Sequence, residues 1–309
     1  MEVVSHQADG ERCAYSLRQR VRRGMTWVAL GAMLLTMERG GEPFGEVPYL
    51  PGSYVVAMGD SITSGEGNPP FMAGTAGQCN RSTAAYPQQL ADRYGFGLKN
   101  VACSGANIDD IAQGKFGEPG QLDALDSTVR LVFITAGISE THLYDFAVRC
   151  TEGDRCESGV DPATDEALDR QRQHTPPRLA ALYVRIAQQA PQADIFVVQY
   201  PQLANSQDGC LLPGFPNLSR TTERYIAATN QAILQAVQQA NAELGAERII
   251  VVPSAQRSAC QRPLTTVWWT NEQNPTGMAH PNTSGHFFIA AAVAEQMTRH
   301  CDKVAARRC

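Results

Sequence analysis

The 309-residue chain lacks the patterns that mark several common functional classes. None of its nine cysteines sits in a Cys-x-x-Cys pair, so a zinc site of the paired-cysteine kind is not expected. No Gly-x-Gly-x-x-Gly follows the first apolar run, which argues against a nucleotide-binding loop. The net charge is −5, whereas nucleic-acid binding needs a clustered basic surface. We therefore expect no metal, no cofactor and no nucleic-acid partner.

Arginines do cluster near the N-terminus, but they introduce a membrane-targeting pattern. Residues 18–23 contain four arginines, and the thirteen residues Met25–Met37 are uncharged and mostly apolar. A basic segment before a short apolar one is typical of a secretory signal, and such a length is too short for a comfortable membrane span. No small-x-small cleavage site follows, so an uncleaved anchor, facing outside, or a misplaced start codon are the alternatives. We assign residues 1–45 to this segment and expect a secreted protein.

The rest of the chain has a globular composition, with 43% hydrophobic and 18% charged residues and no internal repeat. Apolar runs predict five buried strands: Tyr54–Met58, Leu98–Ala102, Leu131–Thr135, Ile195–Gln199 and Ile249–Val252. Helical periodicity predicts four main helices: Ala85–Tyr94, Pro177–Ala190, Thr221–Leu244 and Ser284–His300. This alternation predicts one α/β domain over residues 48–309, with a five-stranded parallel sheet between helices. Two polar segments, Cys150–His174 and Asn205–Asn217, are expected on the surface, at the rim of a substrate cleft.

The first apolar run leads directly into a candidate nucleophile. Tyr54–Met58 breaks into Gly59-Asp60-Ser61, and glycines on both sides of the serine allow sharp turns. Open α/β sheets bind their ligands at the carboxyl ends of the strands, which is where Ser61 is expected. An ordinary serine in a strand-to-loop turn is the alternative interpretation.

A serine hydroxyl needs a base to take its proton before it attacks an ester at neutral pH. Imidazole can accept and then donate that proton, and His280 is the best placed of the six histidines. It lies just before the last predicted helix, on a loop that could reach the carboxyl edge of the sheet. The alternative is a capping or surface histidine.

Two blocks of sequence together resemble a known family. Gly-Asp-Ser-x-x-Ser-Gly-Glu, which contains Ser61, and His-Pro-Asn-x-x-Gly-His, which begins at His280, resemble the first and last blocks of the SGNH (GDSL) hydrolases. The resemblance extends from about Tyr54 to Arg299. It implies a three-layer α/β/α, flavodoxin-like fold and a serine esterase or lipase of the secreted bacterial branch. Such an enzyme forms an acyl-enzyme intermediate and acts on lipid esters or acetylated polysaccharides.

The same resemblance implies an oxyanion hole and reveals a departure from the family pattern. The backbone N–H groups of Ser61 and Gly105 would hold the oxyanion. The family's third strand ends in Gly-x-Asn-Asp, whose asparagine is a third donor, but this chain has Ile138 at the asparagine position. Losing one donor can cost about a hundredfold in rate. The candidate substitute donors are Asn107, Ser139 and His142.

The acid that usually orients the catalytic histidine is also missing. Family members often carry an aspartate three residues before the histidine, where this chain has Gly277. Some secreted relatives use a main-chain carbonyl at this place, so the resemblance implies a Ser-His dyad with the carbonyl of Gly277 orienting His280. Asp60 is expected to bond the surrounding turns rather than His280.

Eight cysteines remain once Cys13 is assigned to the leader, and in an oxidising compartment they would form disulfides. Spacing alone leaves about 105 connectivities open for eight cysteines. The resemblance implies the sequential pairs Cys79–Cys103, Cys150–Cys156 and Cys210–Cys260, with Cys301–Cys309 left as a clip in the tail. It also implies that Arg81 and Tyr86 brace the loop beside the active site. Free thiols of a cytosolic protein are the alternative.

These observations lead to one function and one alternative. The leading interpretation is a secreted, monomeric serine esterase or lipase that touches a membrane only through a retained N-terminal anchor. The alternative is a catalytically weakened protein of the same fold that binds carbohydrate or lipid, and Ile138 is the residue that favours it.

Overall fold

The structure is a computed structural model that describes residues 44–141, 143, 162–202, 216–253 and 280–303. Its five strands form one all-parallel sheet in the order β2-β1-β3-β4-β5. The strands are β1 (Tyr54–Gly59), β2 (Gly97–Asn100), β3 (Leu131–Thr135), β4 (Asp194–Val198) and β5 (Ile249–Val252). The helices are α2 (Ser61–Ser64), α3 (Tyr86–Tyr94), α4 (Ile108–Gln113), η1 (Gln121–Ala124), η2 (Ile138–Thr141), α6 (Pro162–Gln189), α7 (Pro216–Leu244) and α8 (Thr283–Lys303).

The sheet positions the candidate site by its strand order. The central strand β3 is buried along its whole length, as expected for a parallel strand covered on both faces, whereas the edge strand β2 is partly exposed. Strands β1 and β3 pair in register from Val55 opposite Leu131 to Gly59 opposite Thr135. Their carboxyl ends therefore lie side by side, and the turns that follow them meet at one edge of the sheet.

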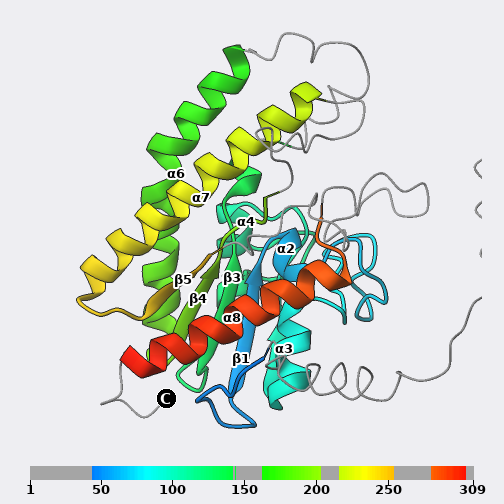
Figure 1. Cartoon of the computed structure of the whole chain (residues 1–309), viewed down its shortest axis with the longest axis vertical. Coiled ribbons are helices and arrows are strands. Elements are labelled where there is room, and N and C mark those ends of the chain that lie inside the picture. The colour runs from blue at the N-terminus through cyan, green and yellow to red at the C-terminus, as the bar shows by residue number, and fades with distance from the viewer. Residues whose placement is uncertain (1–43, 142, 144–161, 203–215, 254–279, 304–309) are drawn as a thin grey trace, which may run out of the picture. The chain divides into compact units, whose positions relative to one another are not determined.

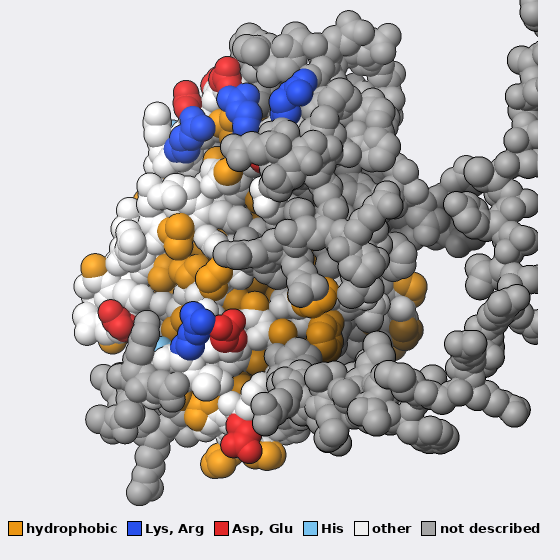
Figure 2. Space-filling view, in the orientation of Figure 1, with side chains coloured by type: hydrophobic (Ala, Val, Ile, Leu, Met, Phe, Trp, Pro, Cys, Tyr) orange, Lys and Arg blue, Asp and Glu red, His pale blue; other side chains and the backbone are white. Residues whose placement is uncertain are grey.

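Helices cover both faces of the sheet and confirm the predicted three-layer α/β/α fold. Helix α8 crosses the strands in front of the sheet and packs against α3 (Figure 1). Helices α6 and α7 pack along each other and extend past the end of the sheet (Figure 1). Their outer ends carry charges of both signs (Figure 2), which pair as Arg170–Glu166, Arg172–Asp169 and Arg224–Asp165.

Helix α6 is longer than the helix Pro177–Ala190 that the sequence predicts, and it includes the end of the predicted surface segment Cys150–His174. The helix begins at Pro162, so residues 162–174 are helical, while residues 150–161 lie outside the described part of the chain. The side chain of Gln171 is buried and donates to the carbonyl of Gly137 and to Thr229 Oγ1, both at 3.0 Å. Sequence rules place a helix end at two consecutive prolines, but α6 continues past Pro176 and Pro177. Tertiary contacts such as those of Gln171 stabilise the helix there.

The edge strand β2 also differs from its prediction. We expected it to continue to Ala102, but it ends at Asn100. The side chain of Asn100 explains this end, because its Oδ1 accepts the backbone N–H of Ala102 at 3.1 Å. Asparagine commonly forms such local bonds to the backbone two residues ahead and so initiates a turn.

Several predictions fall on residues outside the described part of the chain. These include the apolar segment Met25–Met37 and most of the surface segment Asn205–Asn217, of which residues 216 and 217 belong to α7. The division into a leader over residues 1–45 and a domain over residues 48–309 stays a prediction. In the described part of the chain, no helix is both long enough and apolar enough to cross a membrane.

Candidate active site

The site is built on the turn that follows β1. Asp60 caps the short helix α2 by accepting the N–H of Ile62 at 3.0 Å, and Ser61 is the first residue of that helix. Gly59, which precedes Asp60, has a φ of +114°. A Cβ at this position would lie 2.1 Å from the carbonyl oxygen of Thr135 on β3. Only glycine lets β1 turn so close to its neighbour, and this turn points Ser61 out of the sheet.

The side chain of Gln121 forms two hydrogen bonds with the backbone of Gly59. The N–H of Gly59 donates to Gln121 Oε1 at 2.6 Å, and Gln121 Nε2 donates back to the carbonyl of Gly59 at 2.9 Å. Gln121 is buried in η1, so the pair of bonds forms away from water and fixes the end of β1. No pattern in the sequence predicts this role of Gln121.

His280 reaches the nucleophile from the other end of the chain. Its Nε2 lies 2.8 Å from Ser61 Oγ, within hydrogen-bond distance, although the two residues are 219 positions apart. Ser61 is 9% exposed, so its hydroxyl is close to the surface but largely shielded. When Nδ1 carries the proton, Nε2 is free to accept the serine proton. Gly277, whose carbonyl was expected to orient the ring, lies outside the described residues.

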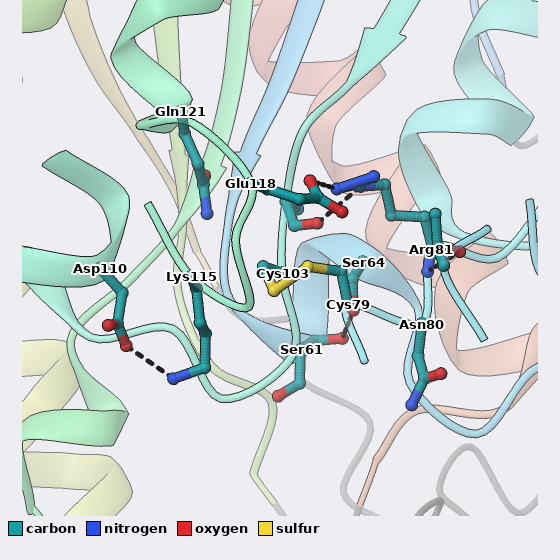
Figure 3. The surroundings of a disulfide bond; sticks show 12 residues. Ser61, Ser64, Cys79, Asn80, Arg81, Cys103, Asp110, Lys115, Glu118 and Gln121 are labelled. Carbon is teal, nitrogen blue, oxygen red and sulfur yellow. Dashed lines mark hydrogen bonds and ion pairs between the residues drawn. A yellow bond between two sulfur atoms is a disulfide. The ribbon is translucent and has the colours of Figure 1, made fainter. Parts of the chain in front are cut away.

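The loop that carries Gly105 is fastened to the nucleophile turn. A disulfide joins Cys79 to Cys103 (Figure 3), which is the first pairing that the resemblance implied. The N–H of Cys103 donates to the carbonyl of Gly59 at 3.0 Å, and the N–H of Ser104 donates to the carbonyl of Cys79 at 3.1 Å. The disulfide and these two bonds hold the segment just before Gly105 against the end of β1.

The other predicted cysteine pairs involve residues that the structure does not describe. Cys301 is itself disulfide-bonded, but its expected partner Cys309 lies outside the described residues. Four further cysteines also lie outside the described residues: Cys150, Cys156, Cys210 and Cys260. Their pairings stay predictions.

Arg81 and Tyr86 are the two residues that the resemblance implied as braces beside the site. The guanidinium of Arg81 donates from Nε to the carbonyl of Ala102 at 3.0 Å and pairs with Glu118 (Figure 3). Tyr86 is buried, and its hydroxyl lies 3.2 Å from Thr63 Oγ1 on α2. Both side chains therefore contact the loops around Ser61, as expected.

In the turn after β3, Ile138 occupies the position of the family's asparagine. The side chain of Ile138 is apolar, and its backbone N–H donates to the hydroxyl of Tyr200 at 3.0 Å. The tyrosine hydroxyl in turn donates to the carboxylate of Asp60. Residue 138 therefore offers neither a side-chain amide nor a spare backbone N–H, and its donor is used to tie β3 to β1 and β4.

The three candidate substitute donors have different surroundings. Asn107 caps α4, since its Oδ1 accepts the N–H of Asp110 at 2.7 Å in a reciprocal capping box. Ser139 is half-buried in η2. His142 lies outside the described residues. None of them is placed against Ser61 by a described contact.

Asp60 links the nucleophile turn to Tyr200, and its environment perturbs its ionisation. The carboxyl group is buried, and this burial raises the pKa of Asp60 to about 7, against the hydrogen bonds from Tyr200 and Ile62 that lower it. Its two partners are the turn residue Ile62 and Tyr200, which agrees with the expectation that Asp60 bonds its surroundings rather than His280. The position of Tyr200, just past a strand end, was the available sequence signal for it.

A second histidine of the closing block has a structural role. His286 is fully buried in α8, and its Nδ1 accepts the backbone N–H of Tyr86 at 3.3 Å, at the start of α3. Helix α3 has no side-chain cap of its own, so this bond satisfies one of its first N–H groups. Burial, and then the neighbouring His280, lower the pKa of His286 to about 3, which keeps the imidazole neutral and able to accept.

Comparisons with known proteins show the family to which the chain belongs. A model of the GDSL-like lipase/acylhydrolase family matches residues 57–287. Lipase 2 of Streptomyces coelicolor is 28% identical over 223 residues, which cover 68% of this chain and 74% of the relative. Lipase 1 of the same organism is 31% identical over 169 residues, which cover 54% of this chain and 58% of the relative.

Two solved structures share the fold. The crystal structure of phospholipase A1 from Streptomyces albidoflavus matches with a TM-score of 0.65 and 21% identity, over 79% of this chain and 99% of that chain. That of an extracellular lipase from Streptomyces rimosus matches with a TM-score of 0.57 and 24% identity, over 78% of this chain and 99% of that chain. Since the family model covers well over half of the sequence, the chain belongs to the GDSL-like lipase/acylhydrolase family and is an ester hydrolase.

Proposed function

We propose that the protein is a secreted serine esterase or lipase that hydrolyses carboxylic esters through a Ser61–His280 dyad and an acyl-enzyme intermediate. The observation that carries this proposal is the 2.8 Å contact between Ser61 Oγ and His280 Nε2 at the carboxyl edge of the sheet. A nucleophile and a base within hydrogen-bond reach form the minimal unit of covalent ester hydrolysis.

In the first half-reaction, Ser61 Oγ attacks the carbonyl carbon of the ester while its proton passes to His280 Nε2. The C–O bond to the alcohol then breaks, and the alcohol leaves with the proton that His280 returns. In the second half-reaction, His280 takes a proton from water, and the resulting hydroxide attacks the acyl-serine. The carboxylic acid leaves and Ser61 regains its proton, so the cycle consumes one water and needs no cofactor.

The oxyanion of each tetrahedral intermediate needs donors that are already in place. We assign this role to the backbone N–H groups of Ser61 and Gly105. The position of the second is supported by the Cys79–Cys103 disulfide and by the bond from Cys103 N–H to the end of β1. Donors held rigidly before the reaction stabilise the transition state without reorganising.

The relatives favour lipid esters as the substrate class. The curated relatives at 28–31% identity are named lipases, and one structural neighbour is a phospholipase A1. Acetylated carbohydrate is the alternative ester. Esters of graded acyl length, assayed beside acetylated xylan, distinguish the two classes.

Secretion is supported by two separate features. The apolar segment Met25–Met37 follows a basic cluster, and the Cys79–Cys103 disulfide requires an oxidising compartment to persist. We propose that the mature protein acts outside the cell as a monomer, with membrane contact limited to a retained N-terminal segment.

A second candidate function rests on Ile138. Because Ile138 lacks the side-chain donor expected at this position, and its backbone N–H is used by Tyr200, the alternative is that the same site binds a lipid or carbohydrate without turning it over.

Hydrolysis of p-nitrophenyl esters by the purified protein, beside Ser61→Ala, decides between the two functions. For the enzyme, we expect the substitution to lower kcat by roughly a thousandfold or more, because no other group can form the acyl intermediate. Equal, background-level turnover by both proteins would support the binding function instead.

A further inference from the structure

The side chain of Asn68 lies between the nucleophile turn and the histidine loop. Its Nδ2 donates to the carbonyl of Pro281, the residue after His280, at 2.7 Å. The same amide group lies 3.1 Å from the carbonyl of Glu66 and 3.4 Å from that of Gly65. One carboxamide therefore contacts two segments that are 213 positions apart in sequence.

Gly65 and Glu66, whose carbonyls Asn68 contacts, are both hydrogen-bonded to the backbone of Ser61. The N–H of Gly65 donates to the carbonyl of Ser61 at 3.0 Å, and the N–H of Glu66 donates to it at 3.1 Å. Asn68 is thus linked on one side, through Gly65 and Glu66, to the carbonyl of Ser61, and on the other side to the carbonyl of Pro281, the residue after His280.

The other oxygen and the backbone of Asn68 strengthen this link. Its Oδ1 accepts from Thr283 Oγ1, the first residue of α8, at 3.4 Å, and its carbonyl accepts from the hydroxyl of Ser82. The residue is only 2% exposed, so water cannot replace these partners. Hydrogen bonds between buried groups are stronger than in water, and leaving one unmade is costly.

We propose that Asn68 is the positioning residue that sets His280 against Ser61, an inference that rests on the proposed function of this pair. The chemistry of the site calls for a carboxamide, because the side chain must donate to carbonyls on both segments and accept a hydroxyl hydrogen. Aspartate has the same shape but no donor, and alanine has neither group. A shift of about 1 Å between a nucleophile and its base can cost as much as a hundredfold in rate.

A reaction that reports the Ser61–His280 pair directly tests this role. With a p-nitrophenyl alkylphosphonate, Ser61 Oγ forms a bond to phosphorus, p-nitrophenolate leaves, and the serine proton passes to His280. The amplitude of the colour change counts folded sites, while its rate reports how well the pair is aligned. A purely structural role would lower the amplitude but not the rate of the sites that remain.

We expect Asn68→Ala and the isosteric Asn68→Asp to react with full amplitude but between about tenfold and a hundredfold more slowly than the unmodified protein. Ester turnover should lose kcat by a similar factor with little change in KM. The matched control is Gln89→Ala, which removes a 3.4 Å bond to the carbonyl of Thr283 at the same helix start and a 2.8 Å bond to the carbonyl of Ala84, but no bond to the carbonyl of Pro281. It should react at the normal rate.

The outcomes separate this inference from the function on which it rests. If the unmodified protein does not react, or if Ser61→Ala reacts equally well, the proposed function is wrong. If Ser61 reacts normally and both Asn68 variants keep the normal rate, or show no labelling at all because they do not fold, Asn68 is not a positioning residue and the inference is rejected.

Discussion

The turns after β1 and β3 begin alike and then use their backbone groups differently. The two strands pair directly, and each leads into a glycine with a positive φ, +114° at Gly59 and +123° at Gly137. After Gly59 the chain presents a serine at a helix start with a histidine 2.8 Å away. After Gly137 it presents an isoleucine whose N–H is used by Tyr200.

The difference shows that backbone geometry and chemistry are separable at this site. Both glycines are needed to let the chain turn at the edge of a packed sheet, which is a requirement of the fold. The side-chain donor that the family pattern has after Gly137 serves the reaction rather than the fold. Here its position is taken by Ile138, whose backbone N–H donates to Tyr200, which in turn donates to Asp60. The turn after β3 therefore supports the site without an evident part in the chemistry.

Alanine substitution at Gly59 or Gly137 should have the largest effect on the free energy of unfolding, and this effect should be larger in the turn after β1 than in the turn after β3. At Gly59 the new Cβ meets the Thr135 carbonyl oxygen at 2.1 Å, and this oxygen cannot move without breaking the pairing of β1 with β3. At Gly137 it meets only the ends of the Leu179 and Thr229 side chains, at 3.3 and 3.4 Å. We expect Gly59→Ala to lower the free energy of unfolding by about 4 kcal/mol and Gly137→Ala by about 2 kcal/mol. Urea denaturation measures both, and equal losses would contradict the distinction.

Asp60, which Tyr200 links to the turn after β3, should make the free energy of unfolding depend on pH, with an effect of intermediate size. Folded Asp60 keeps its proton up to about pH 7, whereas the unfolded chain releases it near the ordinary value of 3.8. The folded state thus binds more protons in this window, and the free energy of unfolding should fall as the pH rises from 4 to 7. Asp60→Asn cannot ionise and can still cap α2.

The measurement is the difference in unfolding free energy between Asp60→Asn and the unmodified protein at several pH values. We expect this difference to shift in favour of the variant by about 3 kcal/mol between pH 4 and 7. Groups that titrate in both proteins, among them the buried His286, cancel in the difference. Parallel stability curves would show that Asp60 does not titrate in this window.

Restoring the family residue after Gly137 should have the smallest effect and tests whether that turn faces the reaction. We expect Ile138→Asn to raise kcat on a short p-nitrophenyl ester by about tenfold, since a further donor would reach the oxyanion. Ile138→Leu is the matched control, because it keeps the apolar volume and adds no donor. If the two variants have equal kcat, residue 138 does not reach the oxyanion, and the resemblance is misleading at this position.

Much of the sheet could be predicted because buried strands have a strong local signal. The apolar runs predicted β3 and β5 with their observed ends, and β1 and β4 within one residue. The edge strand β2 was less well predicted because it is only partly buried and a side-chain bond from Asn100 ends it. Burial on both faces leaves little choice of residue, whereas an edge strand is shaped by local turns.

Helix α6 could not be predicted over its first half because what stabilises it is distant in sequence. Leu168 is fully buried in a small cluster with Tyr225 and Ala228 of α7, and Gln171 bonds Gly137 and Thr229. A polar segment with two prolines has no local reason to be helical. Its structure depends on α7 and on the turn after β3.

The sequence by itself determined the parallel sheet, the serine at the end of the first strand and the histidine before the last helix, because each follows from a short run of residues. Only the tertiary structure decided that Ser61 and His280 lie within hydrogen-bond distance, that Asn68 contacts the segments of both, and that Tyr200 takes the N–H of Ile138. Such contacts join residues tens to hundreds of positions apart, and their geometry is fixed only when the whole core packs around them.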